Sequence, residues 1–162
     1  MIVVKAWYRF TGLMLKAIYR LVYGRSITWG RGLHMRRGFQ ATAEQGGTIT
    51  IGDHVFFNND CGLHARASIS IGDETIFGEH VLVYDHNHRF ADPVAPIKDQ
   101  GYSEAPVSIG SHCWIGSNVT VLKGVTIGDR VVIGAGCVIT DDIPSDTVVR
   151  LEQRTVLEEV RR

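Results

Sequence analysis

Two histidines that are separated by one residue are the side chains whose type and spacing most directly suggest chemistry. They belong to the run Asp85-His86-Asn87-His88. Neutral imidazole accepts a proton near pH 7, which makes histidine the usual general base. A nearby carboxylate can orient such a base, so Asp85 is a candidate to orient His88. No obvious nucleophile adjoins His88, which is consistent with direct group transfer without a covalent enzyme intermediate.

The elements that must position this run form a repeat with a period of six. An aliphatic residue occupies every sixth position in the series Ile109, Ile115, Val121, Ile127, Ile133 and Ile139. This period fits neither an α-helix nor an alternating strand. A chain that turns a corner every six residues closes a triangular coil in three steps. Stacked coils would form a solenoid with a core one coil wide.

The same period precedes the two histidines, with two interruptions. Its earlier positions are Ile51, Phe57 and Leu63, then Ile71, Phe77 and Val83. A two-residue insertion lies between Leu63 and Ile71, and a long one follows Val83 until Ile109. Solenoids commonly carry function in their insertions, so the long insertion is the predicted site.

Length and composition indicate one globular domain. The chain has 162 residues, of which 44% are hydrophobic and 21% charged, enough for one substantial core. The cysteines Cys61, Cys113 and Cys137 form no CxxC pair, which is typical of reduced thiols in a cytosolic protein. We expect no membrane-spanning segment and no secretory signal, because the apolar residues of the N-terminus alternate with Lys and Arg.

Residues 2–23 are predicted to form a basic amphipathic helix. The apolar positions are Ile2, Ala6, Phe10, Leu13, Ala17 and Leu21, and the basic ones are Lys5, Arg9, Lys16 and Arg20. Residues 1–43 contain eight Lys and Arg and no acid. One interpretation is a cap over the open end of the solenoid. The other is an interfacial helix that contacts anionic lipid. Nucleic-acid binding is not expected, because no basic stripe continues into the body.

The predicted organisation has three parts. Residues 1–26 hold the basic helix, and residues 27–143 form the solenoid with the loop 84–106. Residues 144–162 form a C-terminal tail, in which 151–162 is a candidate for a short helix.

Three segments carry a resemblance to a known family. They are Phe57-Asn58-Asn59-Asp60-Cys61, Val83 to His88, and the return from the loop that contains Pro106-Val107-Ser108-Ile109-Gly110, Trp114-Ile115-Gly116-Ser117 and Ile133 to Thr140. In this order they resemble the hexapeptide-repeat acyltransferases, and among them the galactoside, maltose and polysaccharide O-acetyltransferases. The resemblance covers roughly residues 49–142 and implies a left-handed parallel β-helix, an all-β solenoid.

The resemblance also implies roles for individual residues. It makes His88 the catalytic base, Asn58 an acceptor-binding residue, and Ser117, Ala135 and Thr140 the contacts of acetyl-CoA, the acyl donor. A sugar hydroxyl has a pKa far above neutrality, so its attack on a thioester requires a base. Backbone N–H groups at coil corners could stabilise the oxyanion. His86 and Trp114 are further candidates for acceptor binding.

The implied assembly is a homotrimer whose active sites lie in the clefts between neighbours. The expected acceptor is a sugar or oligosaccharide of a bacterial surface polysaccharide or its precursor. We expect a cytoplasmic location, with residues 2–23 as a candidate contact to the inner face of the membrane.

The chain departs from the family pattern in three places. Ala65 occupies a position where the sugar transferases often have an acid, and Asp141 follows Thr140 where a Lys is common. The usual Gly-x-Pro-Ala after the last coil is replaced by Val149-Arg150-Leu151-Glu152. Arg150 and Arg154 are candidates to restore positive charge near CoA.

Two alternatives remain open. A γ-class carbonic anhydrase uses the same solenoid and binds zinc through three histidines, for which His64, His80 and His86 are the nearest match. His80 and His86 are six residues apart, whereas that class has five, so no metal is expected. The other alternative is a non-catalytic β-helix scaffold, which the altered residues near the CoA end motivate.

Overall fold

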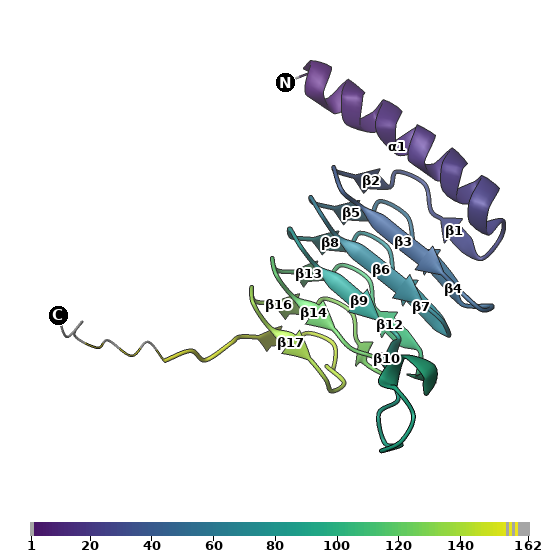
Figure 1. Ribbon diagram of the computed structural model, residues 1–162. Helices are drawn as coiled ribbons and strands as arrows, with labels where there is room; N and C mark the ends of the chain where they lie inside the picture. Colours follow the sequence, from purple (N-terminus) through teal and green to yellow (C-terminus); the bar gives the residue numbers. More distant parts are fainter. Residues whose placement is uncertain (1, 155, 157, 159–162) are drawn as a thin grey trace.

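The computed structural model describes residues 2–154, 156 and 158, with side chains for residues 7, 8 and 10 onward in the N-terminal helix. Three parallel sheets form the faces of the predicted left-handed solenoid (Figure 1). The first face contains β1 (Ile27–Trp29), β4 (Thr48–Ile51), β7 (Ser68–Ile71), β12 (Val107–Ile109) and β15 (Thr126–Ile127). The second contains β2 (His34–Met35), β5 (Phe56–Phe57), β8 (Ile76–Phe77), β13 (Trp114–Ile115), β16 (Val132–Ile133) and β18 (Val148–Val149). The third contains β3 (Gln40–Ala43), β6 (Gly62–Ala65), β9 (Leu82–Tyr84), β14 (Thr120–Val121) and β17 (Val138–Ile139).

The strand register locates the insertions. On the first face, the stacked pairs are Ile27 with Ile49, Ile49 with Ile69, Ile69 with Val107, and Ile109 with Ile127. These partners are 22, 20, 38 and 18 residues apart. Three sides of six residues make a coil of 18, so the 20-residue coil contains the predicted short insertion. The 38-residue step contains the long one.

The core is a column of stacked apolar side chains inside the solenoid. The rings of Phe39, Phe57 and Phe77 stack with centroids 4.8 Å and 4.5 Å apart. Ile115 and Ile133 continue the column and are at most 1% exposed. Each coil buries its apolar residues only against its neighbours, so the stack stabilises the fold cooperatively. All three cysteines are buried, and burial raises the pKa of Cys61 to about 11, consistent with inert thiols.

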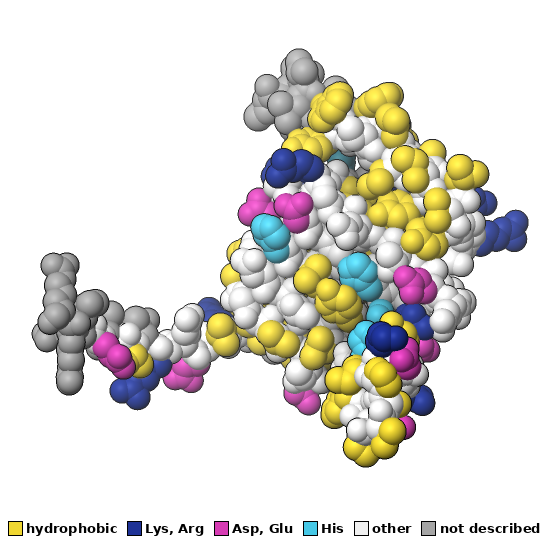
Figure 2. Space-filling view, viewed as in Figure 1, with side chains coloured by type: hydrophobic (Ala, Val, Ile, Leu, Met, Phe, Trp, Pro, Cys, Tyr) yellow, Lys and Arg dark blue, Asp and Glu magenta, His cyan; other side chains and the backbone are white. Residues whose placement is uncertain are grey.

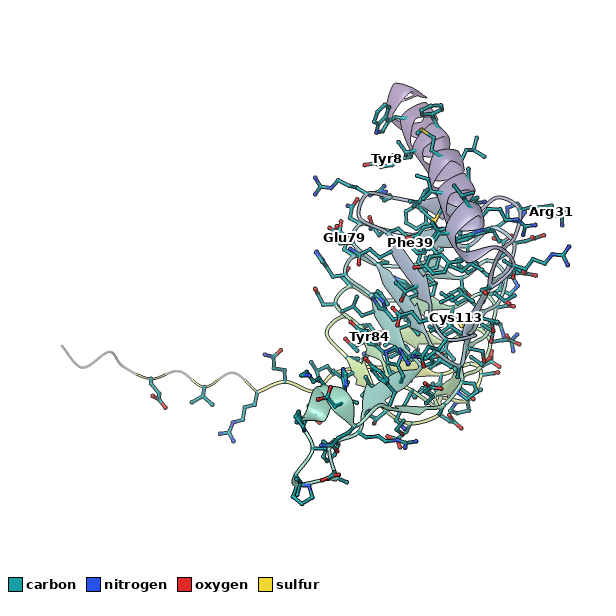
Figure 3. The ribbon with its side chains drawn as sticks, turned by 45° about the vertical axis from the view of Figure 1, so that its right-hand side comes forward. Tyr8, Arg31, Phe39, Glu79, Tyr84 and Cys113 are labelled. Carbon is teal, nitrogen blue, oxygen red and sulfur yellow. The ribbon has the colours of Figure 1, made fainter. Side chains whose placement is uncertain are left out.

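Helix α1 (Ile2–Tyr23) has the predicted bounds and lies across the N-terminal end of the solenoid (Figure 1). Leu15, Tyr19 and Tyr23 pack against the core, and the hydroxyl of Tyr19 accepts a hydrogen bond from the backbone N–H of Ala41 at 2.9 Å. Phe39 lies just below the helix (Figure 3) and contacts the Tyr19 ring. The side chains of Ile2, Lys5, Ala6 and Arg9 lie outside the described part.

The long insertion leaves the solenoid after β9 as a two-stranded ribbon (Figure 1). Strand β10 (His86–His88) pairs antiparallel with β11 (Tyr102–Glu104), and a 3-10 turn, η1 (Ile97–Asp99), lies between them. At the other end of the chain, β18 continues the second face beyond Ile143. The candidate C-terminal helix is not present in residues 151–154, and most of the remainder of that segment lies outside the described residues.

Candidate active site

The predicted site residues lie at two corners of the triangle, except Trp114, which lies on β13 of the second face. The first corner joins the second and third faces and comprises residues 58–61, 78–81, 116–119 and 134–137. The second corner joins the third and first faces and comprises residues 85–106, 122–125 and 140–142. Asn58, Ser117 and Ala135 occupy the first corner. The two histidines and Thr140 occupy the second.

Backbone and side-chain hydrogen bonds align the first corner from coil to coil. The Asn59 amide donates to Glu79 at 3.2 Å, and the Glu79 backbone N–H donates to the Ser117 hydroxyl at 3.1 Å. The backbone N–H of Gly136 donates to the Ser117 carbonyl. Asn58 and Ala135 are therefore three coil steps apart, roughly 14 Å at the usual strand spacing.

A pocket of about 420 Å³ lies along the second face beside this corner. Trp114, Ser117, Ala135 and Arg150 line it, and Trp114 is 54% exposed. The exposed indole offers an apolar wall, and Arg150 offers a fixed cation that can pair with phosphate. The pocket thus combines the two surfaces that a long ligand with an apolar arm and a phosphorylated end requires. From the sequence, Arg150 was a candidate to supply positive charge near CoA. Arg154 does not line the pocket.

Asp85 begins the second corner and is fully buried. Its carboxylate accepts hydrogen bonds from the backbone N–H groups of Arg66 at 2.8 Å and Ala67 at 2.7 Å. These two residues belong to the short insertion, which therefore forms a binding turn for the carboxylate. The third partner is Nδ1 of His86 at 3.0 Å. With its proton on Nδ1, His86 would present an unprotonated Nε2.

This pairing corrects one sequence expectation. Asp85 was expected to orient His88, but its carboxylate contacts His86. Residues alternate between the two sides of a strand, so His86 and His88 lie on the same side of β10, with Asn87 between them. Asp85 precedes the ribbon and is buried, and of the two histidines only its immediate neighbour His86 contacts its carboxylate.

Aromatic rings connect the two histidines with the body of the solenoid. Tyr102 on β11 lies between them, with its ring centroid 4.4 Å from that of His88 and 5.4 Å from that of His86. Tyr84, labelled in Figure 3 near the base of the ribbon, stacks on His64 at 5.0 Å. His88 is exposed, while the side chain of His86 is 18% exposed.

Arg66 holds the ribbon to the solenoid, a role that was not predicted from the sequence. Its guanidinium carbon lies 3.8 Å from the centroid of the Tyr102 ring. It forms ion pairs with Glu104 at 3.2 Å and Glu44 at 3.0 Å, and its side chain is only 5% exposed. The available signal was a single arginine inside the two-residue insertion.

A second pocket, of about 540 Å³, opens beside His88. Its lining includes the charged residues Arg89, Asp92, Asp99 and Lys123, together with Asn87 and Phe90. Phe90 is 77% exposed. The pocket therefore presents hydrogen-bonding groups of both charges around an exposed imidazole and an exposed aromatic ring, a surface suited to a polyhydroxylated ligand.

The structure brings some of the predicted residues together and separates others. Trp114, Ser117 and Ala135 share one pocket, and His86 and His88 share one strand. Thr140 lies at the second corner, and its hydroxyl donates to Asp141 at 2.7 Å. It therefore lies at a different corner from the pocket of Ser117. Asn58 also lies at a different corner from His88, and its side-chain oxygen accepts from Arg36 at 3.1 Å.

The histidines considered for zinc do not form one cluster. His80 lies at the first corner, 3.6 Å from a carboxylate oxygen of Asp60. His64 lies on the third face and shares a 3.0 Å hydrogen bond with Thr42. In the described part of the chain, no group of three His, Cys, Asp or Glu side chains is placed to hold a metal ion.

Comparison with known proteins gives consistent matches. The family described as bacterial transferase hexapeptide (six repeats) matches residues 106–141. An Escherichia coli protein named as a lipopolysaccharide biosynthesis O-acetyl transferase, WbbJ, is 34% identical over 131 residues, which cover 76% of this chain and 67% of that protein. A Mycobacterium tuberculosis protein named as an acetyltransferase is 35% identical over 119 residues, which cover 74% of this chain and 39% of that protein. The chain thus spans from well under half to two thirds of these relatives.

Solved structures agree with the sequence matches. A hexapeptide-repeat containing acetyltransferase of Vibrio cholerae superimposes with a TM-score of 0.67 at 32% identity, covering 82% of this chain and 72% of that one. The same protein, solved in complex with acetyl coenzyme A, gives a TM-score of 0.65 at 33% identity, covering 75% and 64%. The repeat, the coil register and these relatives show that the chain belongs to the hexapeptide-repeat acetyltransferases.

Proposed function

We propose that this protein is an acetyl-CoA-dependent O-acetyltransferase that acetylates a hydroxyl of a sugar, in a surface polysaccharide or its precursor. The observation that carries the proposal is an exposed histidine beside an open pocket lined by both charged and apolar side chains, on a ribbon held in place by buried contacts. The relative named for lipopolysaccharide biosynthesis and the complex of the Vibrio cholerae protein with acetyl coenzyme A support the acceptor class and the donor.

In this proposal the donor lies along the first corner. Trp114 would pack against its apolar arm, Ser117 and the backbone of Ala135 would bind polar groups, and Arg150 would pair with phosphate. Thr140 would contact the donor from the second corner of a neighbouring protomer. When bound, acetyl-CoA supplies an activated acetyl thioester.

His88 is the proposed general base. It would accept the proton of the acceptor hydroxyl as that oxygen attacks, and then return the proton to the departing sulfur, so that no charge remains on the protein. Asn58 and His86 would bind the acceptor. Asp85 would be a positioning residue, because its anchored carboxylate fixes the ring of His86.

We also propose a homotrimer. Asn58, Ser117 and Ala135 lie at one corner of the triangle, and His88 and Thr140 lie at another. Rotation about a three-fold axis would bring the second corner of one protomer against the first corner of the next. The separated halves would then form one site in each cleft. Cytoplasmic location and peripheral membrane contact through residues 2–23 complete this proposal.

The test is release of free CoA thiol from acetyl-CoA in the presence of a panel of sugars and oligosaccharides. We expect turnover in the wild type and a loss of at least about 100-fold in His88→Ala. His34→Ala, an exposed histidine of β2, should retain full activity. Absence of turnover together with absence of a CoA-induced rise in Tm would contradict the proposal and favour the scaffold alternative.

A further inference from the structure

Helix α1 carries an apolar face that no residue of the solenoid covers. Its large side chains are between 52% and 87% exposed: Trp7, Phe10, Leu13, Met14, Ile18, Leu21 and Val22. Figure 2 shows hydrophobic side chains gathered along the helix at the top of the view. Tyr8, Leu15 and Tyr19 are half-buried on the opposite side, which faces the solenoid. The helix is therefore apolar on both sides, whereas a helix that only caps the stack needs one such side.

The surroundings of this face are positively charged. Residues 1–43 contain eight Lys and Arg and no acid. Arg20, Arg25 and Arg37 are exposed, and among the described residues no carboxylate lies within ion-pair distance of them. Each such cation is attracted to the negative surface of an anionic membrane, and this attraction weakens as salt screens it.

An apolar helix face flanked by unneutralised cations matches an anionic bilayer. Acyl chains would take up the apolar side chains, while the cations would meet the lipid phosphates. A second protein would need acidic groups opposite the arginines, and a second copy of this end of the chain has none in residues 1–43. In the part of the chain that the structure describes, no helix is both long and apolar enough to cross a bilayer.

We infer that the outer face of α1 docks the protein on an anionic phospholipid bilayer and that the acceptor is a saccharide anchored in that bilayer. The inference about the acceptor rests on the proposed acetyltransferase function. The helix covers the first coil, and β10 leaves the third coil (Figure 1). Two strand spacings and one helix diameter place His88 roughly 20 Å from the membrane surface. A lipid-linked oligosaccharide can span that distance, whereas a sugar at the lipid phosphate cannot.

The docking is tested by sedimentation of the full chain with phosphatidylcholine vesicles, either pure or with about one third phosphatidylglycerol. We expect binding that requires the anionic lipid. Phe10→Ser/Leu21→Ser should weaken binding about tenfold or more, with an unchanged Tm, because both side chains are exposed. Val94→Ser/Val156→Ser, two exposed apolar residues elsewhere, is the matched control and should bind normally. Arg20→Gln/Arg25→Gln should remove the dependence on anionic lipid.

Equal binding of the Phe10→Ser/Leu21→Ser variant and the wild type, or binding by neither, would overturn the docking. Loss of an oligomer in that variant would also overturn the docking, because the apolar face of α1 would then be an interface between protomers. For the acceptor, the same variant should acetylate a soluble oligosaccharide normally and a vesicle-anchored one at least about tenfold more slowly than wild type. Equal rates of the variant and the wild type on the anchored acceptor would overturn the inference that the acceptor is anchored in the bilayer. Failure of the whole acetyltransferase function would appear separately, as vesicle binding without CoA release.

Discussion

At the scale of single residues, the site depends on the contacts of Asp85. Two backbone N–H groups and one imidazole give both oxygens of this buried carboxylate a hydrogen-bond partner. An amide in the same place would turn its NH2 group toward one of these donors, which leaves a buried group unpaired. Asp85 therefore contributes both to the stability of the second corner and to the orientation of His86.

We expect Asp85→Asn to lower the free energy of unfolding by about 1–3 kcal/mol. Because the carboxylate contacts His86, the acceptor KM should rise and kcat should change little. His86→Ala should do the same, and the double variant should be no worse than the worse single one, since both remove one interaction. Steady-state kinetics with the acceptor varied would measure this. Asp146→Asn, at an exposed carboxylate, is the control. A large loss of kcat in Asp85→Asn would instead connect Asp85 with His88.

His64 predicts a dependence of stability on pH. Burial, together with the nearby His86, lowers its pKa below 6.5, although Glu44 acts in the opposite direction. Between the lowered pKa and 6.5 the unfolded chain binds more protons at this position than the folded one, so stability rises with pH in that window. Acidification below about 6.5 should therefore lower Tm. His64→Gln should flatten the curve measured by thermal unfolding from pH 5 to 8. An unchanged slope would assign the effect to another group.

At the scale of elements, the ribbon β10–β11 is held by a few buried contacts. Arg66 joins three segments, because it pairs with Glu44 after β3 and Glu104 on β11 and lies over Tyr102. The Tyr102 ring in turn lies against His88. A rigid ribbon would place the proposed base, His88, reproducibly, which a mobile loop of the same length would not do.

We expect Arg66→Met to cost about 3 kcal/mol of stability, because it removes a buried cation from two carboxylates and from an aromatic ring. Amide hydrogen exchange at Ser103 and Ala105 should accelerate more than in the core strands. Arg130→Gln removes an exposed ion pair with Asp146 and should have little effect on either quantity. Equal exchange in the ribbon and in the core would mean that Arg66 acts only on global stability.

The elements were largely predictable from sequence, and the contacts within the site were not. The six-residue period can be recognised from single residues such as Ile109 and Ile115. It predicted the solenoid, the coil boundaries and both insertions. The period is interrupted between Val83 and Ile109, so nothing periodic indicated that the Asp85 carboxylate would contact Arg66 and Ala67. The partners of Arg66 lie 22 and 38 residues away. Only the coil register brings them together.

At the scale of the whole molecule, the proposed homotrimer would make assembly a requirement for activity, because the proposed site residues are divided between two corners. His88→Ala damages the second corner, and Ala135→Trp would block the first, where Ala135 is exposed. In a trimer with sites between protomers, each cleft combines corners of two chains. Neither variant alone could then form an intact cleft.

Trimers that contain both variants should regain activity. With equal amounts of each chain, random assembly leaves about one quarter of the clefts with both corners intact. We expect CoA release near that fraction of the wild-type rate after mixed refolding or co-expression, and almost none from either variant alone. Size-exclusion chromatography with light scattering would confirm the assembly. No recovery from verified mixed trimers would place the complete site within one protomer.

The 38-residue step in the coil register has a consequence for how such an enzyme diversifies. Loop-closure entropy grows only with the logarithm of length, so enlarging a step from 18 to 38 residues costs about 0.7 kcal/mol before any contact in the ribbon forms. The coils above and below keep their register and their buried columns. An insertion at this corner can therefore be exchanged or lengthened at little thermodynamic cost. If the ribbon binds the acceptor as proposed, evolution could change the acceptor through the ribbon alone, while the coils proposed to bind the donor stay the same.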